Sequence, residues 1–302
     1  MKFMNFSRKN APNVFRLGCV FGDTCFDITK AIGDDLLEFP RVAFTIEEAL
    51  QVKDGLAVLE EQLGGLERAS SGIQGFLFQA ADVNFRAPIT HPYKLIGIGL
   101  NYKDHVEEIK AQTPKQPLLF GMYGNAIIGP GQAIVLPPMS QQVDYEAELG
   151  VVIGRRARQV GVQTALDYVA GYTIINDVSA RDLQFADGQW VRAKSFDTFA
   201  PMGPYLVTRN SLAGGDGLDI ELRLNGKTMQ KSNTRNLIFK VPDLISYISK
   251  IMTLEVGDVI ATGTPGGVGF VRNPQVFMKA GDIVEIEIEG IGKLMNPVAA
   301  FD

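Results

Sequence analysis

The sequence predicts an α+β protein rich in β-strands, with a small α+β amino-terminal domain over residues 1–90 and a larger domain over residues 91–302. Short buried apolar runs outnumber helical patterns, and one segment alternates apolar with acidic residues. Two prolines four residues apart, Pro88 and Pro92, force an extended passage between the two domains. A chain of 302 residues can also bury a large core without disulfide or metal support.

The amino-terminal domain is expected to begin with short strands and turns over residues 1–40. Thr45 and Glu48 then form a capping box that opens a helix. Leucines at helical spacing continue this helix as far as the Gly64–Gly65 pair, where we expect it to stop, and Gly55 weakens it on the way. Nothing in this domain resembles a catalytic site.

The larger domain is predicted to be mostly β. Buried strands are expected at residues 95–100, 149–153 and 171–175, with a short helix or helical loop over 101–109. The Asn225–Gly226 pair predicts a hairpin turn, and Pro242 marks the first turn of a helix. Alternation of apolar and acidic residues over 284–289 predicts a half-buried strand.

Composition excludes several classes of protein. The chain has 29 basic and 34 acidic side chains, a net charge of −5 and no basic stripe, so no nucleic-acid partner is expected. No apolar run is long enough for a transmembrane helix, so no membrane partner is expected. Two cysteines favour a reducing compartment, here the cytoplasm. With two histidines, His91 and His105, a zinc site built on several histidines is impossible.

A group of acidic residues predicts a metal site with oxygen ligands. If the segment DYEAEL is one strand, Asp144, Glu146 and Glu148 share a face. Asp177 follows a buried apolar run, which places its carboxylate at the mouth of the sheet. Such a site prefers hard cations, namely Mg²⁺, Mn²⁺ or Ca²⁺. A solvated strand face and a turn after the second strand are the alternatives.

Further polar residues could complete such a site. Arg181 and Gln184 share one face of a helical turn and could clamp a substrate carboxylate, and Lys194 could stabilise developing enolate charge. His105 and Glu108 are also three residues apart, and a carboxylate behind an imidazole raises its basicity. Each group could instead be an exposed pair or a surface salt-bridge cluster.

A glycine-rich segment, ATGTPGGVG over residues 261–269, contains no lysine. As a loop it offers backbone N–H groups and the Thr264 hydroxyl to an anion, whereas a plain multi-glycine turn is the alternative.

Five blocks in order give the chain a specific resemblance to the fumarylacetoacetate hydrolase superfamily: NYKDHVEE, DYEAEL, NDVSARDLQ, AKSFD and TGTPGGVG. It resembles the longer bacterial-type members, which carry an amino-terminal domain. The resemblance implies a β-rich catalytic domain of mixed-sheet, β-roll type, a homodimer, and Mg²⁺ or Mn²⁺ as cofactor.

The resemblance also assigns roles to residues of this chain. It implies that Glu146, Glu148 and Asp177 hold the metal and that His105 and Glu108 form an acid–base dyad on a lid segment. It implies that Arg181, Gln184, Lys194 and Thr264 bind the carboxylate and keto oxygens of the substrate. One departure is that the Phe-x-Lys found in many members reads Phe120-Gly-Met122 here, without the lysine.

The expected reaction is hydrolysis of a carbon–carbon bond in a 2,4-diketo acid of the acylpyruvate or fumarylpyruvate type. The His105–Glu108 dyad would deprotonate a water that attacks the distal carbonyl, and Lys194 would help to stabilise the departing pyruvate enolate. Decarboxylation of oxaloacetate and isomerisation of an unsaturated 2-hydroxy diacid are the alternatives, since both use the same enolate. A non-catalytic member of the fold is the remaining possibility, and the complete set of site residues argues against it.

Overall fold

The computed structural model describes residues 1–41, 44–69 and 72–301. Its strands are β1 (Lys2–Arg8), β2 (Ala11–Phe21), β3 (Thr24–Asp27), β4 (Leu77–Phe78), β5 (Val83–Arg86), β6 (Leu95–Gly99), β7 (Leu118–Met122), β8 (Ile127–Ile128), β9 (Ile134–Leu136), β10 (Val143–Asp144), β11 (Ala147–Ile153), β12 (Val169–Asn176), β13 (Ser179–Ala180), β14 (Ala200–Thr208), β15 (Asp219–Leu224), β16 (Lys227–Asn233), β17 (Val259–Ala261), β18 (Ile283–Ile288) and β19 (Gly292–Ala300). Its α-helices are α1 (Ile28–Gly33), α2 (Ile46–Gln51), α3 (Gly55–Ala69), α4 (Lys103–Glu108), α5 (Arg181–Asp187), α6 (Trp190–Lys194) and α7 (Val241–Ile251).

Within the described residues the strands form three sheets. The largest has 12 strands in the order β4-β3-β2-β1-β14-β12-β11-β17-β6-β7, with β5 beside β1 and β8 beside β14. A 5-stranded sheet has the order β16-β15-β18-β19-β9, and β10 pairs with β13. Most pairs are antiparallel, but β17 with β6, β14 with β8 and β19 with β9 are parallel. The strand-rich α+β fold with mixed sheets is therefore confirmed.

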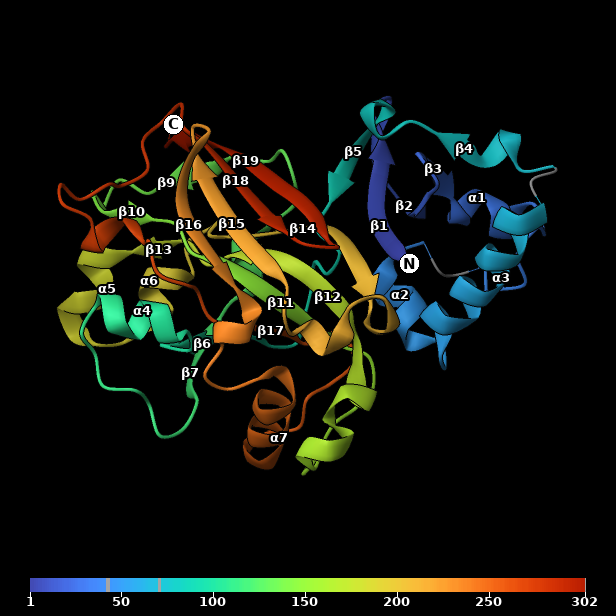
Figure 1. Ribbon diagram of the computed structural model, residues 1–302. Coiled ribbons are helices and arrows are strands. Elements are labelled where there is room, and N and C mark those ends of the chain that lie inside the picture. The colour runs from blue at the N-terminus through green and yellow to red at the C-terminus, as the bar shows by residue number, and fades with distance from the viewer. Residues whose placement is uncertain (42–43, 70–71, 302) are drawn as a thin grey trace.

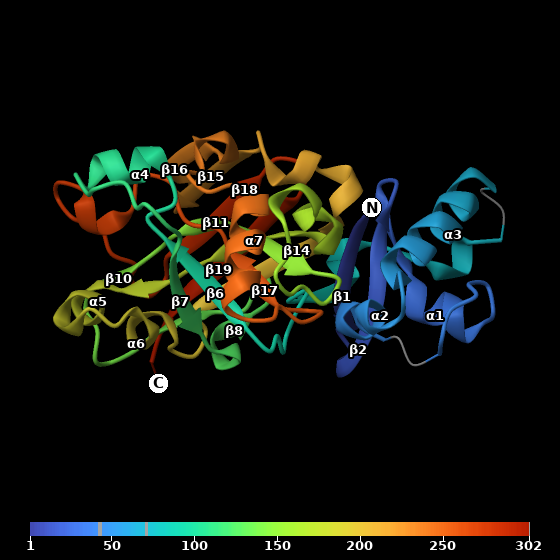
Figure 2. The ribbon, with the colours of Figure 1, turned by 90° about the horizontal axis from the view of Figure 1, so that it is seen from below.

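The two larger sheets pack face to face. In Figure 1 the sheet containing β15, β16, β18 and β19 lies over β11, β12 and β14 of the larger sheet. Side chains from both sheets belong to one apolar core, among them Ile174, Leu222 and Ile286, each no more than 1% exposed. Figures 1 and 2 place α4 and α5 at the end of the molecule opposite α1 and α3, beyond the large sheet. This arrangement positions the polar residues discussed below.

The amino-terminal strands continue the large sheet, because β1 pairs with β14 in the register Lys2–Val207 and Phe3–Leu206. A domain boundary between residues 90 and 91 stays a prediction. The helix predicted after Thr45 is present, with the Thr45 hydroxyl accepting from the Glu48 N–H, and it divides into α2 and α3 at Gly55, the expected weak point.

The predicted stop at Gly64–Gly65 is wrong, because α3 runs through both glycines to Ala69. Leu56, Leu59 and Leu63 on this helix are buried in the core. Burial of each leucine contributes about 1.5–3 kcal/mol, which outweighs the roughly 1 kcal/mol that each glycine costs relative to alanine.

Several predicted elements of the larger domain are confirmed. The buried strands appear as β6, β11 and β12, and the alternating segment appears as β18. The hairpin between β15 and β16 turns at Asn225 and Gly226, whose φ angles of 52° and 78° suit a type I′ turn. Pro242 lies in the first turn of α7. Among the described residues, no helix is both long enough and apolar enough to cross a membrane.

Candidate active site

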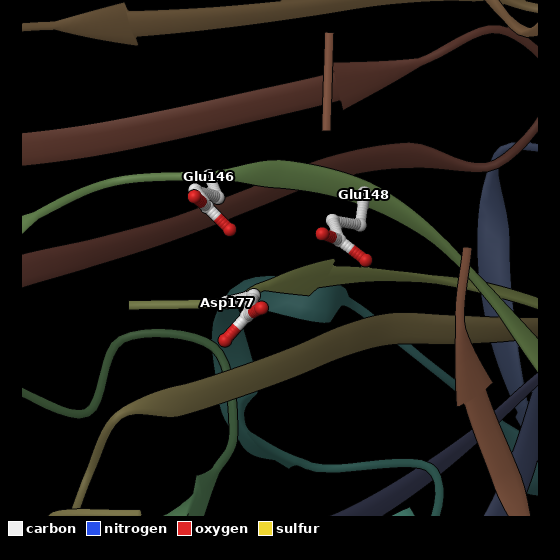
Figure 3. A group of neighbouring side chains, drawn as sticks. All are labelled: Glu146, Glu148 and Asp177. Atoms are coloured by element: carbon white, nitrogen blue, oxygen red, sulfur yellow. The ribbon is translucent and has the colours of Figure 1, made fainter. Parts of the chain in front are cut away.

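Three carboxylates meet where β11 and β12 come together. Glu146 directly precedes β11, Glu148 lies within it, and Asp177 directly follows β12. Because the antiparallel pairing sets Ala147 opposite Asn176, all three side chains reach the same end of the strand pair (Figure 3). One oxygen from each carboxylate lies within 4.8 Å of the others. All three side chains are buried, so they do not form a solvated strand face.

Asp144 does not join this group, although the sequence placed it on the same strand face. Asp144 ends β10, which pairs with β13 in the two-stranded sheet, and the chain joins the large sheet only at Ala147, where β11 begins. The Asp144 carboxylate instead accepts hydrogen bonds from Arg181 Nε (2.9 Å) and from the backbone N–H groups of Gly269 (2.8 Å) and Phe270 (3.1 Å). It thereby joins Arg181 to the glycine-rich loop.

Two cations lie against the three carboxylates. Lys194 Nζ is 2.7 Å from both Glu146 Oε2 and Asp177 Oδ2. Arg181 Nη2 is 2.7 Å from Glu146 Oε1, and Arg181 Nη1 donates to Gln184 Oε1 at 2.8 Å. Arg181 and Gln184 therefore lie beside the three carboxylates, and Arg181 binds two carboxylates of the chain itself, those of Asp144 and Glu146.

Burial and mutual repulsion perturb the pKa values of these carboxyl groups. Burial, with the neighbouring Asp177 and Glu146, raises the pKa of Glu148 well above its usual range. Burial also raises the pKa of Asp177, to about 7. For Glu146 burial acts in the same direction, but Lys194 and Arg181 outweigh it and lower the pKa to about 2. Glu148 and Asp177 therefore keep their protons to higher pH than usual, and a bound cation would compete with protons for these two carboxyls.

The donor set fits a hard divalent cation. All three side chains offer oxygen, the ligand that Mg²⁺ and Mn²⁺ prefer. Asp177 Oδ1 is buried and has no hydrogen-bond partner among the described residues, so it is an acceptor that a cation would satisfy. Glu148 Oε2 is oriented by the backbone N–H of Gly263, at 2.8 Å.

The predicted dyad lies on α4. His105 Nδ1 is 3.6 Å from Glu108 Oε2, slightly beyond hydrogen-bonding distance. Both Glu108 oxygens face the backbone N–H of Gly267, at 3.0 and 2.9 Å. Burial opposes ionisation of Glu108, but His105 and the Gly267 N–H outweigh it and lower its pKa. The helix is held over the site by a hydrogen bond from the Ser232 hydroxyl to Asp104.

Backbone N–H groups of the glycine-rich loop donate hydrogen bonds to carboxylates of the protein itself. Gly263, Gly267 and Gly269 donate respectively to Glu148, Glu108 and Asp144. The sequence predicted either an anion-binding loop or a plain multi-glycine turn here. In the structure its N–H groups orient a candidate metal ligand, the dyad carboxylate and the carboxylate that holds Arg181.

Eight of the nine predicted site residues line one cavity of about 190 Å³: His105, Glu146, Glu148, Asp177, Arg181, Gln184, Lys194 and Thr264. The ninth, Glu108, is in contact with His105 and is not among the lining residues. The cavity thus brings together an imidazole, three carboxylates and several side-chain hydrogen-bond donors.

Aromatic walls of this cavity were missed by the sequence analysis. Phe120 packs edge-on against Trp190 with ring centroids 5.4 Å apart, and Phe185 packs against Phe270 at the same distance. These residues come from four separate segments with no shared sequence pattern, so only the fold reveals them. Met122, at the position where the resemblance implies a lysine in many members, is buried in the hydrophobic core, while Phe120 lines the cavity.

Comparison with known proteins agrees with this geometry. The family described as fumarylacetoacetate (FAA) hydrolase, C-terminal, matches residues 94–299. The mitochondrial oxaloacetate tautomerase Fahd2a of Rattus norvegicus is 46% identical over 223 residues, which cover 74% of this chain and 71% of that protein.

Solved structures match over the full length. The fumarylacetoacetate hydrolase of Exiguobacterium antarcticum is 33% identical with a TM-score of 0.81, covering 100% of both chains. The maleylpyruvate hydrolase of Sphingobium sp. SYK-6, solved with manganese(II) and pyruvate, is 30% identical with a TM-score of 0.77 and the same coverage. The chain therefore belongs to the fumarylacetoacetate hydrolase family of enzymes.

Proposed function

We propose that this enzyme interconverts the keto and enol forms of oxaloacetate, using Mg²⁺ or Mn²⁺. The observation that carries the proposal is the single cavity that joins a base, His105 backed by Glu108, to the buried carboxylates Glu146, Glu148 and Asp177. Enolisation of a 2-keto acid needs these two parts, a group that moves a proton at C3 and an electron sink at the C2 oxygen.

The residues of the chain have distinct tasks in this reaction. In the keto-to-enol direction His105 takes a proton from C3, the C3–H electron pair becomes the C2=C3 double bond, and the carbonyl pair moves to O2, which gains a proton. Glu108 stabilises the imidazolium. Lys194 and Thr264 stabilise negative charge on the oxygens, and Arg181 with Gln184 orients a carboxylate. The bound cation supplies Lewis-acid polarisation of the keto group.

Relatives support tautomerisation over the hydrolysis that the sequence analysis expected first. Proteins named oxaloacetate tautomerase in Rattus norvegicus, Bos taurus and Homo sapiens are 46–48% identical to this chain over 220 or 223 residues. Tautomerisation also requires no attacking water, so the His105–Glu108 pair is sufficient as proton carrier. Oxaloacetate decarboxylation would pass through the same enolate and is distinguished by its products.

Hydrolysis of an acylpyruvate is the second candidate, and the aromatic walls favour it. Phe120 with Trp190 and Phe185 with Phe270 offer apolar surface to an acyl group beyond the 2-keto acid. The structurally similar maleylpyruvate hydrolase, solved with manganese(II) and pyruvate, acts on a substrate of this class. In this reaction His105 would activate a water instead of removing a C3 proton.

The experiment follows oxaloacetate and a panel of acylpyruvates with protein loaded with Mn²⁺. The ultraviolet absorbance of the enol reports tautomerisation, while chromatography reports total oxaloacetate, pyruvate and released acid. We expect enol and keto forms to equilibrate faster with protein while total oxaloacetate stays constant. Release of pyruvate with carbon dioxide would indicate decarboxylation, and release of pyruvate with a second acid would indicate hydrolysis.

A matched pair of variants assigns the base. His105→Gln should lower the rate by about 10²–10⁴-fold with the metal still bound. His91→Gln makes the same change at an exposed histidine outside the cavity and should leave the rate unchanged. Equal rates with and without manganese-loaded wild-type protein would overturn the proposal.

A further inference from the structure

Gln230 is a buried residue of β16 that reaches from the five-stranded sheet to two parts of the site. Its side chain is 1% exposed. Its Oε1 accepts a hydrogen bond from the backbone N–H of Ala147 at 2.9 Å. Its Nε2 donates to the carbonyl oxygen of Pro265 and to Thr264 Oγ1, each at 2.8 Å. Gln230 does not itself line the cavity.

The backbone partners determine which way the Gln230 amide faces. A backbone N–H can only donate and a carbonyl oxygen can only accept. The amide oxygen must therefore face Ala147, and the amide nitrogen must face Pro265. If the amide were flipped, its nitrogen would face the N–H of Ala147, donor against donor, and its oxygen would face the carbonyl oxygen of Pro265, acceptor against acceptor. Because the amide nitrogen can only donate, the Thr264 hydroxyl oxygen must accept the hydrogen bond from it.

This contact leaves the single hydroxyl hydrogen of Thr264 free for another partner. Thr264 lines the cavity and is 5% exposed, and its hydroxyl donates no hydrogen bond to another described residue. We propose that Gln230 is a positioning residue that holds the Thr264 hydroxyl as a donor toward an oxygen of the bound keto acid. This inference rests on the proposed function, since it needs a keto acid in the cavity.

The Ala147 contact requires a second readout. Ala147 lies between Glu146 and Glu148, so loss of Gln230 could act on the metal ligands instead of on Thr264. A disturbed metal site would weaken Mn²⁺ binding. An effect transmitted through the hydroxyl would leave Mn²⁺ binding intact and would disappear when the hydroxyl is absent.

The test measures binding of oxalate, a stable planar analogue of a keto-acid enolate, to the Mn²⁺-loaded protein by calorimetry. Gln230→Glu keeps the shape but has at most one hydrogen to donate, so the Thr264 hydroxyl is drawn toward residue 230. We expect about 10- to 100-fold weaker oxalate binding, the value of one hydrogen bond to a charged ligand. Thr264→Val should lose a similar factor.

A double variant separates positioning from a structural effect. In the Thr264→Val background, Gln230→Glu should change oxalate affinity by less than about twofold, with unchanged Mn²⁺ affinity. Gln230→Met serves the same comparison if the glutamate variant does not fold. Full additivity of the two substitutions, or oxalate affinity equal to wild type in Gln230→Glu, would overturn the inference alone. Wild-type protein that binds Mn²⁺ but no oxalate would overturn the proposed function as well.

Discussion

Gly267 offers a sharp test of how the glycine-rich loop orients the dyad. Its N–H group contacts both oxygens of Glu108, and its φ angle is +104°. A Cβ atom at this position would lie 2.2 Å from the carbonyl oxygen of Met229, whereas ordinary contacts begin near 3.4 Å. Since Met229 O belongs to the backbone of β16, Gly267→Ala must displace the loop by about 1 Å.

The expected effect follows from that displacement. A misplacement of about 1 Å in a catalytic group can cost on the order of 10²-fold in rate. A side chain forced into this backbone region costs about 1–3 kcal/mol of stability. Gly267→Ala should therefore lose about 10²-fold in kcat and unfold at lower denaturant concentration. Its Mn²⁺ affinity should stay unchanged, because Gly267 contacts no candidate metal ligand.

The neighbouring glycine is the matched control. A Cβ atom on Gly266 would lie 3.4 Å from Asp104 O and from Glu108 Oε2, which is ordinary contact, and its φ is not positive. Gly266→Ala should keep kcat within a few-fold of wild type. The measurement is kcat of both variants under saturating oxaloacetate. Equal kcat values for the two variants would refute the reasoning that Gly267 orients Glu108.

Three further predictions concern the metal site, the buried ion pair and the amino-terminal helix. Mn²⁺ affinity of the metal-free protein should rise as pH increases through about 7, because burial raises the pKa values of Glu148 and Asp177 and each carboxyl must lose a proton to bind. Calorimetry in two buffers of different ionisation enthalpy measures the protons released on Mn²⁺ binding. Binding without proton release would contradict the prediction. Asp144→Asn should lower the unfolding free energy by about 1–3 kcal/mol, since Arg181 loses one of its two buried carboxylate partners and keeps Glu146. Denaturant titration compares it with Asp167→Asn, whose exposed pair with Arg209 should contribute less than about 1 kcal/mol. Gly65→Ala should raise the unfolding free energy by about 0.5–1 kcal/mol, because its Cβ meets nothing within 4 Å inside α3, and a loss of stability would show strain there.

Local sequence signals predicted several strands of the larger domain, among them β6, β11, β12 and β18, and the convergence of the three carboxylates. Glu146 and Glu148 alternate along one strand, and Asp177 ends the next one, so pairing of adjacent strands suffices to bring them together. The same alternation misplaced Asp144, because nothing local signals that the chain joins the large sheet only at Ala147. The helix stop at Gly64–Gly65 was wrong for a different reason, since burial of leucines on the same helix outweighed the low helix propensity of glycine.

Contacts between segments that are distant in the sequence could not be predicted from local sequence signals. Gln230 and Thr264 are 34 residues apart, and they meet only because β16 packs beside the glycine-rich loop. The aromatic pair of Phe120 and Trp190 likewise joins β7 to α6. Positions of this kind depend on how the sheets and helices pack, and no period or spacing in the sequence encodes them.

Exchange of the C3 hydrogens of oxaloacetate for deuterium tests most directly whether the cavity enolises a keto acid. Nuclear magnetic resonance follows the exchange in deuterated buffer with Mg²⁺-loaded wild-type protein, His105→Gln and Glu146→Gln. We predict that wild-type protein accelerates the exchange well above the rate in buffer with Mg²⁺ alone, and that both variants lose the acceleration. Exchange at the buffer rate with wild-type protein, or undiminished exchange with His105→Gln, would contradict enolisation at this site.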